Sequence, residues 1–93
     1  MQTFFMYGKY TADSIRGMST ERTREAVKTI DIAGGKVESI YALLGDFDLV
    51  MIVKFPKMEA AMKASVALNQ LTGINISTVP ALIVEEFDKL IGK

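Results

Sequence analysis

The chain has 93 residues, of which 49% are hydrophobic and 24% charged, and its 11 basic residues balance its 11 acidic ones. Binding to nucleic acid or to an anionic membrane depends on a basic excess, so the zero net charge argues against both partners. The absence of cysteine and histidine excludes disulfides, thiol nucleophiles, Cys/His zinc sites, haem held by histidine and imidazole catalysis. We therefore expect no metal and no cofactor.

The length predicts one domain, residues 1–93. The first residues lack the basic segment and the small-residue cleavage site of a secretory signal peptide. Residues 64–84 carry no charge, but Asn69, Gly73 and Pro80 divide them into a helix end and a strand, which argues against a membrane span. The expected location is cytoplasmic.

The first half of the chain predicts a strand followed by a helix. Residues 3–10 carry aromatic side chains at both odd and even positions, which would place them on both faces of a strand. This is typical of a central strand covered on both sides. Residues 11–18 predict a loop or a single helical turn. Ser19 or Thr20 can cap the helix that follows, and Gly34-Gly35 can end it.

The last third predicts a second helix, a strand and a tail. Residues 57–71 predict a helix rich in Ala and Met, with a broad apolar face made by Met58, Ala61, Met62, Ser65, Leu68 and Leu71. Ala60, Ala64 and Ala67 widen this face, which indicates a helix covered on more than one side. Residues 74–84 alternate as a strand, and Pro80 makes it an edge strand or one with a bulge, because proline cannot donate to a ladder. Residues 85–93 predict a short amphipathic tail.

Between the helices, residues 36–55 predict a β-hairpin. Two apolar runs, 36–44 and 47–55, flank Gly45-Asp46, and glycine at the first central position suits a type II′ turn. This turn places Tyr41 opposite Val50. Alternation then predicts one face that meets the helices and a second face directed to a partner or a cavity. The first face comprises Ile40, Ala42, Leu44, Phe47, Leu49, Met51, Val53 and Phe55; the second comprises Ser39, Tyr41, Leu43, Asp48, Val50, Ile52 and Lys54.

The order strand, helix, strand, strand, helix, strand predicts an α+β, ferredoxin-like βαββαβ fold. Right-handed crossovers give an antiparallel sheet of order 4-1-3-2 with both helices on one face. The other face is apolar, and soluble monomers seldom leave such a face wet. We therefore expect a homodimer through the sheet face, as in a dimeric α/β barrel, or a higher oligomer, with an interface of about 1,600 Å² or more.

The hairpin also carries a family motif. The run Gly45-Asp46-Phe47-Asp48 resembles the Gly-x-Tyr-Asp motif of the GYD-domain family, with Phe in place of Tyr. The resemblance extends over nearly the whole chain, through Tyr10-Thr11, Gly34-Gly35-Lys36, Tyr41, Phe55-Pro56, Thr78-Val79, Ala81 and Glu85-Glu86. It implies a ferredoxin-like dimeric barrel and leaves the activity open, and no role of the motif's phenol can be carried over to Phe47.

A second resemblance is to the effector-binding domain of the Lrp/AsnC regulators. That domain also places a Gly-x-Tyr-Asp-like hairpin in a ferredoxin-like dimer. The sequence has neither a helix-turn-helix domain nor a basic surplus, and a stand-alone module of that type is left open as an alternative.

Five residues are candidates for binding a small-molecule ligand: Asp48, Tyr41, Ser39, Tyr10 and Arg16. Asp48 is a carboxylate on a mostly apolar face beside a tight turn. It either serves a ligand or bonds backbone N–H groups of the turn or a neighbouring loop. Tyr41 either donates to a ligand or lines a dimer core, and Arg16 either holds a ligand carboxylate or is a solvated loop residue.

Three functions stay open at this level. The first is a small-molecule-binding or sensor module with a cavity between helices and sheet or between paired sheets. The second is a cofactor-free enzyme, monooxygenase- or isomerase-like, in which acid–base work falls to Asp48 with a tyrosine partner. The third is a purely structural oligomerisation module. The sequence lacks the Gly/Arg-rich anion cradle of an acylphosphatase, which argues against that class of enzyme. It also lacks the aromatic and basic strand residues of an RNA-recognition motif, which argues against RNA binding of that kind.

Overall fold

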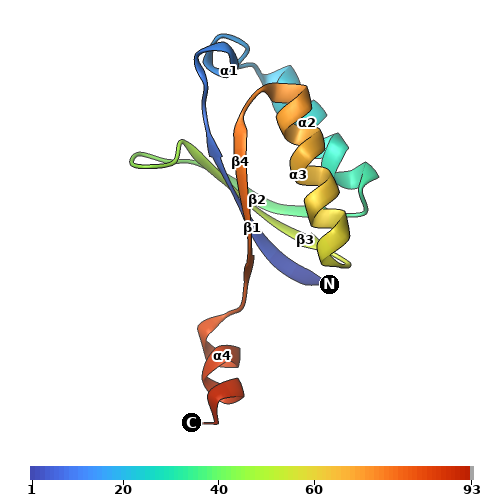
Figure 1. Ribbon diagram of the computed structural model, residues 1–93, viewed down its shortest axis with the longest axis vertical. Coiled ribbons are helices and arrows are strands. Elements are labelled where there is room, and N and C mark those ends of the chain that lie inside the picture. Colours follow the sequence, from blue (N-terminus) through green and yellow to red (C-terminus); the bar gives the residue numbers. More distant parts are fainter. Residues whose placement is uncertain (93) are drawn as a thin grey trace.

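The computed structural model describes residues 1–92, which form a four-stranded antiparallel sheet and four helices. The strand order is β2-β3-β1-β4, so the predicted ferredoxin-like sheet order is confirmed. Helices α2 and α3 lie together on one face of the sheet, and α4 extends away from the body beyond the end of β4 (Figure 1). Within residues 1–92, no helix is long and apolar enough to cross a membrane. The elements are β1 (Gln2–Lys9), α1 (Ala12–Arg16), α2 (Thr20–Ile32), β2 (Lys36–Ala42), β3 (Leu49–Phe55), α3 (Met58–Thr72), β4 (Asn75–Ala81) and α4 (Val84–Ile91).

Alternation along the two central strands forms the core between the sheet and the helices. Phe4 and Met6 of β1 are buried on the helix side, where the ring of Phe4 meets the ring of Phe55 edge-on at a centroid distance of 5.7 Å. The remaining core side chains come from β3, α2 and α3: Met51, Val53, Ile30, Ala61, Ala64 and Leu68. The odd-numbered residues of β3 therefore face the helices, as the hairpin pattern predicted.

The helix termini follow the predicted signals. The Ser19 hydroxyl accepts a hydrogen bond from the Arg22 backbone N–H at 3.0 Å and caps α2. Gly34, just after α2, has a φ of +90°, a left-handed conformation that glycine adopts without steric cost. Residues 12–16 form the single helical turn expected before this helix.

The buried face of α3 is narrower than the predicted one. Ala61, Ala64 and Leu68 of the predicted face are buried, whereas Met58 and Met62 are 50% and 62% exposed. At roughly 100° per residue, Met62 lies well around the helix from Ala64 and borders the hollow between α3 and β4. Leu71, in the last turn, is 42% exposed. The small alanines bring α3 close to the sheet and leave the two methionines on its flank.

The hairpin strands are shorter than predicted. The register is confirmed, because Tyr41 lies opposite Val50, with an irregularity between Val37 and Ser39. The strands end at Ala42 and resume at Leu49, however, so residues 43–48 form a loop instead of a two-residue turn. Gly45 has a φ of +144°, far from the roughly +60° of a type II′ turn.

The tip of the hairpin also lies outside the helix-covered core. The loop projects away from α2 and α3 (Figure 1). Leu44 is fully exposed and Ile40 is 39% exposed, contrary to their expected place against the helices. The helices are too far from this end of β2 and β3 to cover it. At the opposite edge of the sheet, Pro80 lies in β4, which pairs with β1 alone, so the edge-strand prediction is confirmed.

The close approach of β2 to the core supplies a stability test. A Cβ added at Gly35 would lie 2.8 Å from Ile30 Cγ2 and 2.8 Å from Phe55 Cδ1, closer than real Cβ contacts. We expect Gly35→Ala to lower the free energy of unfolding in urea by about 1–3 kcal/mol, because the core must shift to admit the methyl group.

Gly17→Ala is the matched control for this test. A Cβ at Gly17 would meet only the end of the Arg22 side chain, Nη1, at 3.0 Å, so it disturbs at most the hydrogen bond from this atom to the Ser14 carbonyl and leaves the core unchanged. A Gly35→Ala protein as stable as the parent would contradict the packing described for this corner.

Candidate functional site

Asp48 joins the hairpin loop to the end of the first strand. Its Oδ2 atom accepts a hydrogen bond from the Tyr10 backbone N–H at 2.8 Å. Its own backbone N–H donates to the Gly8 carbonyl at 2.8 Å, and its carbonyl accepts from the Leu43 N–H at 2.8 Å. Asp48 was expected either to serve a ligand or to bond backbone N–H groups nearby. The bond to the Tyr10 N–H matches the second of these roles.

The helix-free side of the sheet, which we call the outer face, carries an aromatic strip. The ring of Phe47 packs on that of Tyr7 at a centroid distance of 4.9 Å, and Tyr7 lies 6.2 Å from Phe5. Phe47 was expected to meet the helices, and this prediction is wrong. Because residues 43–48 form a loop, the strand alternation ends at Leu49, and Phe47 is free to cover Tyr7 instead.

Strand pairing places the other outer-face residues around this strip. Val50 lies between Tyr7 of β1 and Tyr41 of β2 and is 7% exposed, whereas Tyr41 is 57% exposed. The outer face comprises Phe5 and Tyr7 of β1, Ser39 and Tyr41 of β2, Val50, Ile52 and Lys54 of β3, Ser77 and Val79 of β4, and Phe47 of the loop. Lys54 forms an ion pair with Glu38 of β2 at 3.4 Å, away from the aromatic strip. Tyr41 and Ser39 therefore share one face, and Tyr10 and Asp48 meet at its end.

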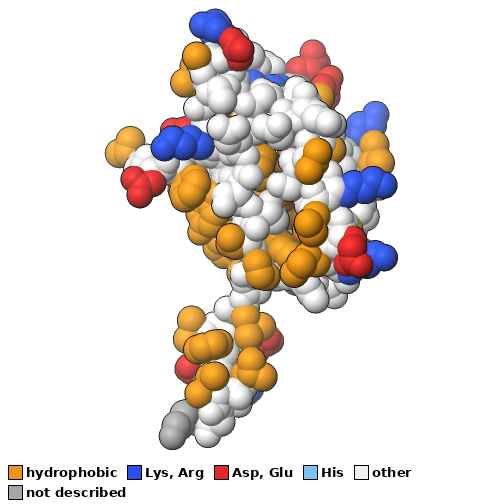
Figure 2. Space-filling model, viewed as in Figure 1, with side chains coloured by type: hydrophobic (Ala, Val, Ile, Leu, Met, Phe, Trp, Pro, Cys, Tyr) orange, Lys and Arg blue, Asp and Glu red, His pale blue; other side chains and the backbone are white. Residues whose placement is uncertain are grey.

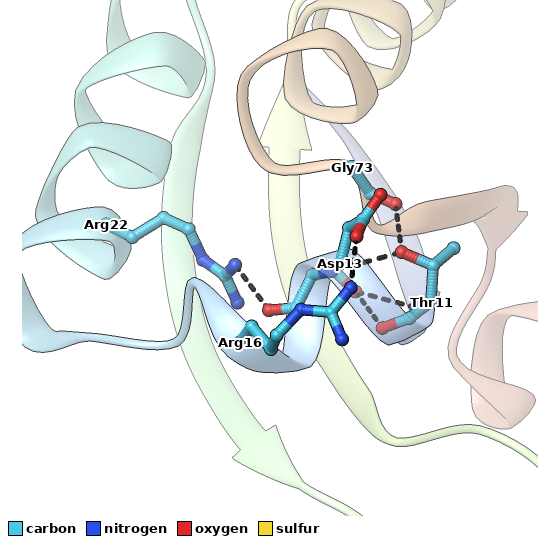
Figure 3. A network of polar contacts seen from close by, with 6 residues as sticks. Thr11, Asp13, Arg16, Arg22 and Gly73 are labelled. Carbon is cyan, nitrogen blue, oxygen red and sulfur yellow. Dashed lines mark hydrogen bonds and ion pairs between the residues drawn. The ribbon is translucent and has the colours of Figure 1, made fainter.

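Arg16 does not join this group. It lies at the end of α1 and pairs with Asp13 three residues earlier, and both side chains are highly exposed (Figure 3). The surface pair contributes little stability. This position fits the interpretation of Arg16 as a solvated residue.

A polar cluster around α1 was not foreseen. Thr11 and Ser14 form a capping box in which each side chain accepts a hydrogen bond from the other's backbone N–H. Thr11 Oγ1 also donates to the Gly73 carbonyl at 3.2 Å, and Arg22 Nη1 donates to the Ser14 carbonyl at 2.6 Å (Figure 3). The cluster ties α1 to the start of α2 and to the end of α3. The Thr-x-x-Ser spacing of Thr11 and Ser14 is the sequence feature from which this capping box could have been predicted.

Three hollows in the surface lie away from the candidate residues. They are one of about 480 Å³ between α2 and α3, one of about 760 Å³ beside the base of α4, and one of about 410 Å³ between α3 and β4. None of these three is lined by a candidate residue. Within residues 1–92, no three Asp or Glu side chains are placed to hold a metal ion together.

Comparison with known proteins places this fold and motif in a family. The model of the GYD domain family matches residues 4–91, so the chain belongs to the GYD domain family. The search of curated proteins found no match.

Among solved structures, the chain is similar to the crystal structure of the Mycobacterium tuberculosis leucine response regulatory protein, LrpA. The TM-score is 0.58 and the sequence identity 15%, over 87% of this chain and 50% of that one. This likeness shows a common fold, and this chain spans about half the length of the regulator.

Removing the carboxylate of Asp48 tests its part in the fold. We expect Asp48→Ala to lower the free energy of unfolding by about 1–3 kcal/mol, because the hydrogen bond of the Tyr10 N–H to a charged acceptor is lost. Hydrogen exchange followed by NMR should show faster exchange of the Tyr10 amide.

The neighbouring Asp46, which is exposed, provides the matched control, and Asp46→Ala should change neither quantity. Unchanged stability together with unchanged Tyr10 exchange in Asp48→Ala would rule out the structural role.

Proposed function

We propose that the protein is a small-molecule sensor module that works as a homodimer, with its ligand held between the outer faces of two copies. The observation that carries the proposal is the aromatic strip of Phe5, Tyr7 and Phe47 on a sheet face that no helix covers within residues 1–92. The likeness in fold to a leucine response regulatory protein supports a regulatory role.

The physical case for the dimer rests on the make-up of the outer face. Its centre is aliphatic and aromatic, and Val79 on the edge strand is 40% exposed. Large apolar patches on soluble proteins mark interaction sites. Two outer faces stacked about 10 Å apart form the usual sheet-on-sheet arrangement, and they would remove both patches from water together.

The polar groups at the rim define the ligand class. Tyr41 and Ser39 bring hydroxyl groups to the face, and the carboxylate of Asp48 stands at its end, with Oδ2 engaged by the Tyr10 N–H. Aromatic rings favour an apolar or cationic group, and a carboxylate favours a hydrogen-bond donor. The arrangement suits a small molecule with an apolar body and a donor head group such as an ammonium.

Native mass spectrometry of the freshly purified protein tests the proposal. We expect a dimer whose mass exceeds that of two chains by that of a small molecule, and the excess should be lost on denaturation. An empty dimer would point to a structural oligomerisation module instead. A monomer at micromolar concentration would overturn the proposal.

A charge placed on the outer face tests the interface separately. Val79 lies opposite Phe5 on this face, so Val79→Lys would bury an unpaired ammonium in the dimer. We expect the dimer dissociation constant to rise by about tenfold or more, measured by light scattering coupled to size exclusion.

Val66→Lys is the matched control. Val66 is 59% exposed on α3, which covers the opposite side of the sheet, so this change should leave the outer-face dimer intact. Equal dimerisation of both variants and the parent would show that the outer face is not the interface.

A further inference from the structure

The helix α4 presents an apolar face that the rest of the chain leaves uncovered. Within Val84–Ile91 no residue is buried, and in Figure 2 hydrophobic side chains gather on one side of this helix. The apolar residues of α4 and the preceding position, Ile83, Val84, Phe87, Leu90 and Ile91, are 51–74% exposed. A helix of eight residues gains little stability without such burial.

Acidic side chains flank this apolar face on both sides. At roughly 100° per residue, Glu86 and Asp88 lie to either side of Phe87, and Glu85 lies farther around the helix. Helices that lie on anionic membranes carry basic flanks, so the charge pattern argues for a protein surface with basic rims.

The hollow between α2 and α3 has these properties. Its floor is apolar, and Lys57 and Lys63 lie among its lining residues, with Glu59 as the one acidic member. Because Ala60, Ala64 and Ala67 have small side chains, they leave the hollow deep enough for the larger side chains of a third helix. Ile32, at its side, is 78% exposed. We call this hollow the α2/α3 trough.

The α4 helix of the same chain cannot occupy this trough. α3 contacts β4 and α2 contacts β2, so the trough lies across α3 from the strand that leads into α4. Only Leu82 and Ile83 connect β4 to α4, and the three Cα–Cα steps from Ala81 to Val84 span at most about 11 Å. A path around α3, whose diameter is roughly 10–12 Å, is about 16 Å or longer. The occupant must come from another chain.

We propose that α4 of one copy docks in the α2/α3 trough of a second copy, and that the second copy returns the same contact. The apolar side chains of α4 expose roughly 100 Å² each. Two reciprocal contacts therefore cover on the order of 1,000 Å² of α4 surface before the troughs are counted, which meets the size that a specific interface needs. Exchange about a two-fold axis joins the copies in closed pairs, and two outer-face dimers joined in this way form a closed tetramer when the two axes are perpendicular.

The uncharged hollow between α3 and β4 is the competing receptor within the protein. It is lined by Met58, Met62 and Val66, among others, and carries no lysine to face the acidic flanks of α4. Charge complementarity therefore favours the α2/α3 trough. The contact uses surfaces distinct from the outer face, so it stands or falls independently of the sensor proposal.

Disulfide cross-linking tests this docking, because the natural chain has no cysteine. Full-length Leu90→Cys protein, labelled with ¹⁵N, is mixed with unlabelled Ile32→Cys protein in a glutathione redox buffer, and mixed dimers are counted by mass. We expect several-fold more mixed disulfide here than in two control mixtures. One control pairs Lys89→Cys, on the polar side of α4, with Ile32→Cys; the other pairs Leu90→Cys with Met62→Cys, in the competing hollow.

Charge reversal supplies the second arm. Adding Glu86→Lys and Asp88→Lys to the Leu90→Cys chain, or Lys57→Glu and Lys63→Glu to the Ile32→Cys chain, should each reduce the cross-link several-fold. Combining the two reversed chains should restore it, which a simple loss of folding would not allow. Equal cross-linking to Ile32→Cys and Met62→Cys, or no restoration in the doubly reversed mixture, would overturn the proposal.

Discussion

The hydrogen bond between the Asp48 carboxylate and the Tyr10 N–H connects segments that lie 38 residues apart in the sequence. Together with the bond from the Asp48 N–H to the Gly8 carbonyl, it holds the hairpin loop against the end of β1. Phe47 is thereby placed on Tyr7, and the aromatic strip of the outer face is completed. The last position of the family motif thus fixes the geometry on which the proposed site depends.

A second constraint follows from the number of helices available to the sheet. α2 and α3 cover one face, and their alanines and Ile30 fill the space above Phe4 and Phe55. The outer face and α4 are left with apolar surface that a single chain does not bury. The two surfaces differ in character, since the outer face is a sheet with a polar rim and α4 is a helix with acidic flanks. We accordingly assign them two different contacts.

Much of this architecture could be predicted from local residue patterns. Alternation in β3, the Ser19 cap, the glycines after α2 and Pro80 in β4 each act within a few residues, and each was interpreted correctly. The loop at 43–48 was not predicted, because Gly45-Asp46 also suits a two-residue turn. The hydrogen bond that holds the longer loop joins Asp48 to Tyr10, which is distant in the sequence. The prediction that Phe47 faces the helices was wrong for the same reason. Alternation with a period of two holds only for residues that are paired in the β-ladder, and Phe47 lies outside it. The predicted face of α3 was too wide, because the hydrophobicity of Met58 and Met62 does not show that they are buried, whereas Ala61, Ala64 and Leu68 were placed on it correctly.

The central claim, that the outer face meets a second copy, is tested most directly by isotope-filtered NMR on a mixture of labelled and unlabelled protein. The account predicts intermolecular NOEs from the methyl groups of Ile52 and Val79 in labelled chains to aromatic protons of Phe5, Tyr7 or Phe47 in unlabelled ones. If these methyl groups gave no intermolecular NOEs in a sample that light scattering shows to be dimeric, the outer face would not be the dimer interface.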